Sequence, residues 1–200
     1  MDESFADRAG SSPALWLYRG LLVWLAWWML RLGGGATSWC WLDLVNLAFH
    51  EAGHVFLSPF GKTIRYLGGT IGQLLVPGLL AVYFLLWQAR PHASAVCVWW
   101  LGESLVNVSI YMADARSLAL PLVGGGDHDW NELFFRFGAL TEPEVAAISG
   151  AVRTLGVLSM GAGLVWGLYF ALSAPRREAV REAVVSRLPW AGRALAPDPW

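Results

Sequence analysis

The chain has 200 residues and a formal net charge of −1, and 56% of its residues are hydrophobic while only 14% are charged. Soluble globular domains carry about a quarter charged residues, so this composition, with a mean hydropathy of +0.47, predicts a chain embedded in a lipid bilayer. The near-neutral charge gives no electrostatic basis for binding nucleic acid, and the length suits one helical bundle without a large soluble module.

Hydrophobic segments recur along the chain, and a helix needs about 20 such residues to cross a bilayer. We predict an all-α, polytopic transmembrane helix bundle with about five spans, at 14–32, 39–57, 68–88, 93–113 and 147–173. Residues 1–13 are polar and lack the basic start of a cleaved signal peptide. Residues 174–200 form a basic tail, which the positive-inside rule places in the cytoplasm. We therefore expect an integral, multi-pass membrane protein, in the cytoplasmic membrane if the organism is a prokaryote, with a core at 14–173.

Local signals mark where several of these helices begin and end. The second span is followed by a polar interruption at 58–66, in which Pro59 and Gly61 end the helix. Thr141 and Glu144 form a capping box, which predicts the start of the last helix. Five complete spans would place the N-terminal segment and the C-terminal tail on opposite sides of the membrane.

The second span carries the motif HEAGH, which matches the H-E-x-x-H signature of zinc-binding helices. His50 and His54 are four residues apart, so both imidazoles lie on one face and can reach one Zn²⁺. Glu51 is rotated by about 100° from His50, beside the metal rather than on it. There it can take a proton from an attacking water and later pass it to a leaving group. Ionisable residues within a membrane span are costly, which favours a functional interpretation.

The motif is part of a wider polar stripe along the second span. Asp43, Asn46, His50 and His54 follow one another at steps of three, four and four residues, which places them on one helix face. Asn46 can hydrogen-bond the non-metal nitrogen of His50 or can bind a neighbouring helix, and the sequence favours neither. We expect Asp43 to lie nearer the membrane surface.

A catalytic zinc site needs a third protein ligand. The fourth span offers Glu103, Asn107 and Asp114, at helical spacing. Asp114 stands at the end of that span, where a carboxylate can approach from a facing helix. Glu103 is an alternative ligand, but it lies deep in the span, where we expect it to satisfy another polar group or to stay protonated. The loop at 124–130 offers a rival ligand, His128.

The same loop permits simpler interpretations. Asp129 and Glu132 fit an N-terminal cap for a helix at 130–137. The three glycines of the loop suit a gate over the site or a plain linker. Cys40 and Cys97 fit neither a disulfide framework nor a cysteine-based zinc site, and we interpret them as small core residues.

With a membrane-embedded HEAGH and a distal Asn…Asp pair, the chain resembles the site-2 protease family of intramembrane zinc metalloproteases, over roughly residues 39–123. The polar segment FGKTIRYLGGTIGQ after the motif also resembles that family. The resemblance implies that Asp114 is the third zinc ligand and that Asn107 polarises the substrate carbonyl or positions the substrate. No proline follows Asn107 and no glycine follows Asp114, so the chain looks like a minimal, divergent relative.

The sequence thus predicts a zinc metalloprotease that cleaves a peptide bond of a membrane protein or peptide in or near the bilayer. His50, His54 and Asp114 are the predicted zinc ligands, and Glu51 and Asn107 the predicted catalytic residues. The alternatives are a zinc-dependent hydrolase of a lipid amide or ester, a non-catalytic membrane scaffold of the same fold, and a transporter that uses the intramembrane polar residues as an ion path.

Overall fold

The structure is a computed structural model that describes residues 13–123, 126–139, 141–172 and 174–188. Within these ranges every regular element is helical. The elements are α2 (Pro13–Gly33), α3 (Leu42–Leu57), the 3₁₀ turn η1 (Ser58–Phe60), α4 (Lys62–Leu86), α5 (Pro91–Ala113), α6 (Asp129–Phe137), α7 (Glu142–Ala171) and α8 (Ala174–Arg187). The predicted helical class is therefore correct. The capping box of Thr141 and Glu144 is confirmed at the start of α7.

The prediction of five spans is only partly supported. Within the described residues, three helices are long and apolar enough to cross a membrane, namely α4, α5 and α7. The helix of the first predicted span, α2, includes two arginines and four tryptophans, which lower its hydropathy. The helix of the second, α3, has 16 residues and is therefore about 24 Å long, shorter than a hydrocarbon core of about 30 Å.

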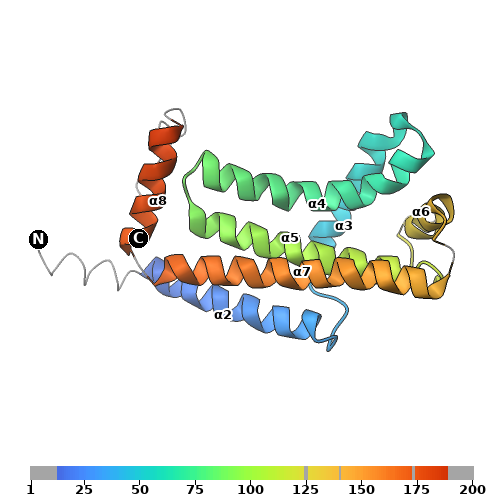
Figure 1. Ribbon diagram of the computed structural model, residues 1–200, viewed down its shortest axis with the longest axis horizontal. Coiled ribbons are helices and arrows are strands. Elements are labelled where there is room, and N and C mark those ends of the chain that lie inside the picture. The colour runs from blue at the N-terminus through green and yellow to red at the C-terminus, as the bar shows by residue number, and fades with distance from the viewer. Residues whose placement is uncertain (1–12, 124–125, 140, 173, 189–200) are drawn as a thin grey trace, which may run out of the picture.

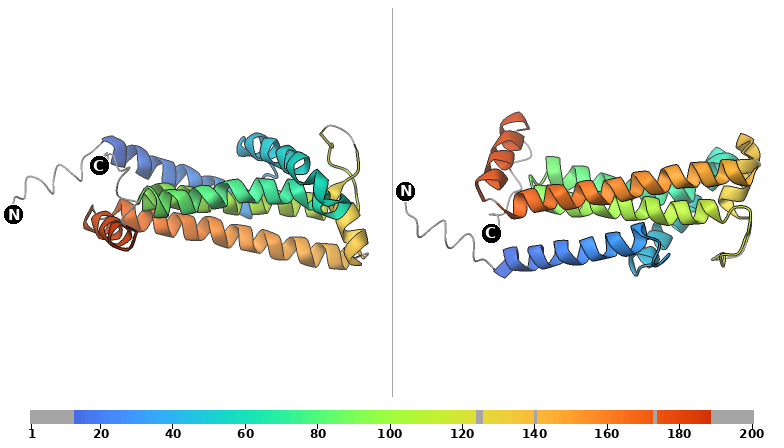
Figure 2. Two further views of the ribbon diagram at one scale, coloured as in Figure 1. Left: turned by 90° about the horizontal axis from the view of Figure 1, so that it is seen from above. Right: turned by 60° about the horizontal axis from the view of Figure 1, so that its bottom comes forward.

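The long helices α2, α4, α5 and α7 run roughly side by side, as Figure 1 shows, while α3 crosses them steeply and α6 lies across one end of the bundle. The views of Figure 2 show the same arrangement from two other sides. The start of α2 and the end of α7 lie at one end of the bundle, and α6 lies at the other. Five complete spans would instead place the start of the first helix and the end of the last helix at opposite ends of the bundle.

Glycines bring two pairs of helices into backbone contact. A Cβ on Gly53 of α3 would overlap the backbone of Gly68 of α4, and a Cβ on Gly72 would collide with the carbonyl of Phe49. Glycine pairs of this kind let membrane helices approach closely. These glycines let α3, which carries HEAGH, pack directly against the backbone of α4. Gly102 and Gly156 join α5 to α7 in the same way.

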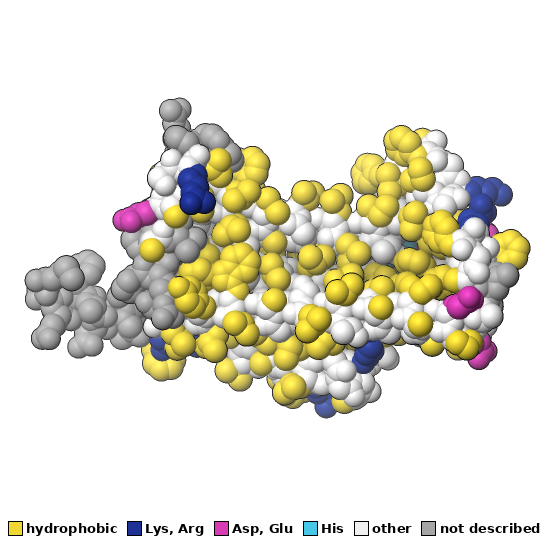
Figure 3. All heavy atoms as spheres, viewed as in Figure 1, with side chains coloured by type: hydrophobic (Ala, Val, Ile, Leu, Met, Phe, Trp, Pro, Cys, Tyr) yellow, Lys and Arg dark blue, Asp and Glu magenta, His cyan; other side chains and the backbone are white. Residues whose placement is uncertain are grey.

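The surface agrees with a membrane environment. Large apolar side chains are exposed along the long helices, among them Leu75, Leu79 and Val82 of α4 and Leu155, Leu158 and Val165 of α7. Figure 3 shows apolar side chains over most of the face formed by α4, α5 and α7. The few charged side chains visible there lie toward the two ends and along the edge formed by α2. Such an apolar surface is what a bilayer covers.

Candidate metal centre

Three side chains from two helices converge beside α4. The Nε2 atoms of His50 and His54 lie 3.2 Å and 3.1 Å from Oδ2 of Asp129. All three ligand atoms lie within 4.8 Å of one another, and the side chains are largely buried. The two histidines come from α3, four residues apart as the motif requires, and Asp129 is the first residue of α6.

The spacing of these atoms fits a tetrahedral metal site. Zinc binds nitrogen and oxygen at about 2.0–2.2 Å, so two ligand atoms of a tetrahedral site lie about 3.3 Å apart. The two measured distances to Asp129 are close to that edge length. Two imidazoles and one carboxylate also form one of the donor sets found in catalytic zinc sites, with the fourth position open.

A backbone carbonyl fixes which nitrogen of His54 can bind a metal. Nδ1 of His54 lies 2.7 Å from the carbonyl oxygen of Arg65 in α4, which can only accept a hydrogen bond. Nδ1 must therefore carry the proton, and the lone pair of the neutral ring is on Nε2, which faces Asp129. A neutral His54 cannot donate to Asp129 from Nε2, so the pair requires either a protonated ring or a cation between them.

A glycine leaves room in front of both histidines. A Cβ on Gly69 of α4 would collide with Nε2 of His50 and with Nε2 of His54. Any side chain at this position would occupy the space to which the ligand atoms point. Gly69 thus forms a cradle that fits an ion bound by these residues.

Electrostatics favours an ionised carboxylate in this position. Burial alone would raise the pKa of Asp129, but the hydrogen bonds with His50 and His54 outweigh it and hold the pKa below its usual value. The ionised carboxylate is the form that binds a cation.

Tyr111 and Glu51 complete the surroundings of the centre. The Tyr111 hydroxyl accepts a hydrogen bond from the backbone N–H of Asp129 at 3.2 Å and donates to Oδ2 of the same residue at 3.5 Å. Its ring packs edge-on against His50. Glu51 is exposed and forms no hydrogen bond or ion pair within the described part of the chain, yet its charge acts on His54. A free carboxylate therefore stands beside the converging ligands.

The structure does not bring Asp114, the predicted third ligand, into this group. Asp114 accepts hydrogen bonds from the Ser117 hydroxyl at 2.6 Å and from the backbone N–H groups of Ala119 and Leu120 at 2.9 and 3.0 Å. Burial opposes ionisation, but these donors lower the pKa of Asp114 below its usual value. Asp114 thus caps the turn that follows α5, and this turn leads toward the segment before α6.

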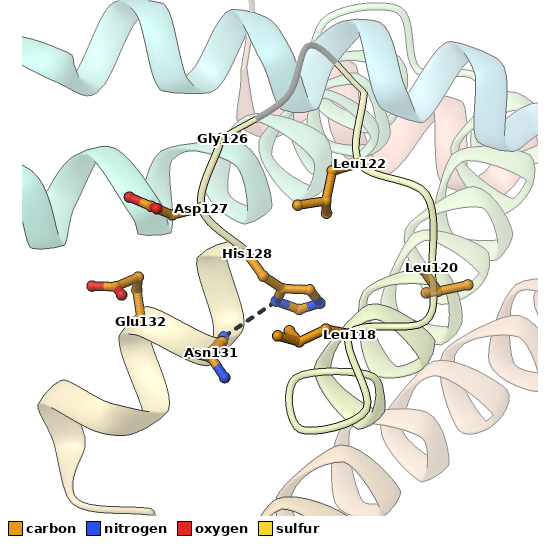
Figure 4. Close-up of a pocket in the computed structure, with 8 residues that line it drawn as sticks. All are labelled: Leu118, Leu120, Leu122, Gly126, Asp127, His128, Asn131 and Glu132. Carbon is orange, nitrogen blue, oxygen red and sulfur yellow. Dashed lines mark hydrogen bonds between the residues drawn. The ribbon is translucent and has the colours of Figure 1, made fainter.

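His128, the rival ligand, is also engaged elsewhere. Its Nδ1 accepts the backbone N–H of Asn131 at 3.2 Å, so His128 is the N-cap of α6. Figure 4 shows this hydrogen bond and the ring directed toward Leu118, in a pocket of about 260 Å³. Burial lowers the pKa of His128, which favours the neutral ring that a cap acceptor requires. Its Nε2 faces Asp114 at 3.5 Å.

The remaining predicted polar residues form a separate, deeper cluster. Asn46 donates to Glu103 at 2.8 Å, so of its two possible roles it has the contact with a neighbouring helix. Asn107 accepts from Gln73 of α4 at 2.8 Å, one helical turn from Tyr111. Asp43, which was expected nearer the membrane surface, is buried, and one of its carboxylate oxygens lies within 4.8 Å of ligand atoms of Cys40 and Glu103.

Sequence reasoning did not select Asp129 as a ligand, because the pair with Glu132 fitted a helix cap. The helix does start there, but its cap is His128, one residue earlier. That shift places Asp129 in the first turn with its carboxylate turned toward the histidines. The one sequence signal for Asp129 as a possible ligand was its place directly after His128 in a glycine-rich loop. Comparison with known protein families, characterised proteins and solved structures found no match to this chain.

Proposed function

We propose that the protein is a membrane-embedded zinc metalloprotease with His50, His54 and Asp129 as its zinc ligands. The observation that carries this proposal is the convergence of two Nε2 atoms and one carboxylate oxygen at 3.1–3.2 Å, in front of a glycine that leaves the space open. Asp129 replaces Asp114 in the predicted ligand set, while the chemistry inferred from HEAGH stays the same.

Glu51 is the proposed general base. Bound zinc would supply a Lewis acid that activates water and polarises the substrate carbonyl. Glu51 follows His50 on α3 and is exposed, so it can accept a proton from the attacking water and return it to the leaving amine. Its lack of another partner in the described residues leaves it available for this exchange.

Tyr111 is proposed for the role that the family resemblance implied for Asn107. Asn107 is engaged with Gln73, whereas the Tyr111 hydroxyl lies at the backbone and carboxylate of Asp129. A phenol in this position can turn to donate a hydrogen bond to the oxygen on which charge develops. We therefore assign carbonyl polarisation to Tyr111.

The location of the centre supports a substrate bond near the membrane surface. Gly69 is seven residues after the start of α4, about 10 Å along the helix, and Tyr111 is two residues before the end of α5. The centre is therefore near one end of two candidate spans. We propose a peptide bond near the membrane surface as the substrate, in a membrane protein or membrane-bound peptide.

The experiment compares wild type with Glu51→Gln in cells and after purification. We expect Glu51→Gln to retain zinc and to lower proteolysis about 10²–10⁴-fold, since it removes only the base. Profiling of new N-terminal peptides in membranes of cells expressing either form identifies cleaved proteins, and liposomes containing a fluorogenic lipid ester or amide test the lipid hydrolase. Equal cleavage by both forms, or zinc that survives loss of both His50 and His54 in full, would contradict the proposal.

A further inference from the structure

A second set of potential ligands is buried deeper in the bundle. Cys40 precedes α3, Asp43 is in the first turn of α3 and Glu103 is in the middle of α5. One ligand atom from each of the three lies within 4.8 Å of the others. Their exposed fractions are 1%, 9% and 1%, and the set shares no residue with the centre formed by His50, His54 and Asp129.

Neighbouring side chains fix the orientation of Glu103. The indole N–H of Trp100 can only donate, and it lies 2.8 Å from Oδ1 of Asn46. The amide nitrogen of Asn46 must therefore point the other way, and it donates to Oε2 of Glu103 at 2.8 Å. The second oxygen, Oε1, accepts a hydrogen bond from the Cys40 thiol at 3.7 Å.

Asp43, the third member of the set, has one carboxylate oxygen without a hydrogen-bond partner. Its Oδ2 accepts the backbone N–H of Cys40 at 2.7 Å, whereas its Oδ1 is buried without a hydrogen-bond partner. A buried, unsatisfied carboxylate oxygen is unfavourable, and so are two adjacent buried carboxyl groups without a counter-charge. Over the ranges that the structure describes, no Lys or Arg forms an ion pair with Asp43 or Glu103.

We propose that Cys40, Asp43 and Glu103 bind a second divalent transition-metal ion of the zinc class. Two carboxylate oxygens and a sulfur converge, and a thiolate ligand favours zinc or cobalt over magnesium or calcium, which prefer oxygen. The backbone N–H of Leu42 donates to the sulfur at 3.3 Å, which offsets part of the cost that burial and Glu103 impose on its anionic form. On binding, the thiol proton is released and the sulfur forms the bond to the metal.

This second ion would have a structural consequence for the first centre. It would join the segment before α3 to the middle of α5, and α3 carries both histidines of HEAGH. A proton shared between Asp43 and Glu103 would relieve their repulsion, and the Cys40 thiol donates to Oε1 of Glu103 at 3.7 Å. What favours a metal over a proton is that all three side chains offer a ligand atom to one another's neighbourhood, whereas a proton joins only two of them.

Cobalt substitution tests the proposal, because only this set contains a thiol. The full-length protein in detergent, stripped with a chelator and loaded with Co²⁺, should show thiolate-to-cobalt charge-transfer absorption in the near ultraviolet. We expect the band to disappear in Cys40→Ser and to remain in the matched control Cys97→Ser, since Cys97 is the other buried cysteine. The band should also remain in a His50→Ala, His54→Ala variant, so that failure of the proposed protease leaves this test unaffected.

Metal content gives a second readout. Wild type should retain about two zinc ions per chain, and Glu103→Gln, which preserves side-chain shape, about one. Circular dichroism and size-exclusion chromatography report whether each variant is folded. A folded, cobalt-loaded wild type without a thiolate band overturns the proposal, as does a band that persists in Cys40→Ser. A zinc content unchanged in folded Glu103→Gln also overturns it.

Discussion

Asp129 is the carboxylate that reaches both histidines of HEAGH, and its removal tests the ligand assignment directly. We expect Asp129→Ala to lose one zinc ion per chain relative to wild type, because two imidazoles alone hold zinc weakly. Asp114→Ala should keep that ion, since the Asp114 carboxylate is held by Ser117 and by backbone N–H groups. Elemental analysis of the purified variants measures both outcomes. Zinc loss in Asp114→Ala with full retention in Asp129→Ala would restore the ligand set inferred from the family resemblance.

The difference between these two aspartates shows what residue patterns can and cannot predict. His50 and His54 belong to one helix, so their common face follows from a spacing of four residues alone. The proposed third ligand, Asp129, comes from another element, and its position depends on where a loop ends and α6 begins. A shift of the cap from Asp129 to His128 decides which carboxylate faces the histidines. Spacing within one helix carries no information about such a shift.

At the level of elements, the crossing of α3 and α4 leaves open space at Gly69, which the proposed zinc ion would occupy. Gly69→Ala should lower zinc affinity by at least about 10-fold, because the new methyl group would collide with both Nε2 atoms. Gly78→Ala is the matched control, since it lies on the same helix and a Cβ there has open space around it. Both variants carry the same gain in helix propensity. Competition with a chromophoric chelator measures the affinity, and equal affinities in the two variants would refute the cradle.

The elements themselves were largely predictable, because hydropathy and caps are local properties. The helices of 68–88, 93–113 and 147–173 correspond to α4, α5 and α7, and the capping box starts α7 as predicted. The segment at 39–57 was predicted to span the membrane because its apolar run has 19 residues. The helix within it has only 16 residues and begins after the buried Cys40. Whether an apolar run crosses the bilayer or packs on its neighbours depends on tertiary contacts such as the glycine crossing.

For the whole molecule, the length of α3 determines the topology. The end of α2 is tied to α7 by Arg153, which donates to the carbonyl of Leu32 at 2.6 Å. Arg31 stands at the same level of α2, and arginines near helix ends are typical of the membrane surface. Because α3 is too short to cross again, the loop between α2 and α3 should lie on the same side of the membrane as the start of α4. Five complete spans would place these two segments on opposite sides.

Labelling of single introduced cysteines from one side of sealed vesicles distinguishes these topologies. Ser38→Cys lies in the α2–α3 loop, Lys62→Cys at the start of α4, and Gln88→Cys in the turn between α4 and α5. We expect a membrane-impermeant maleimide to label the first two from the same side and Gln88→Cys from the other. The native Cys40 and Cys97 are both buried, so the background should be low, as the unmodified chain will show. Ser38→Cys labelled together with Gln88→Cys would instead require α3 to cross the membrane, and the metal centre would then lie at bilayer depth.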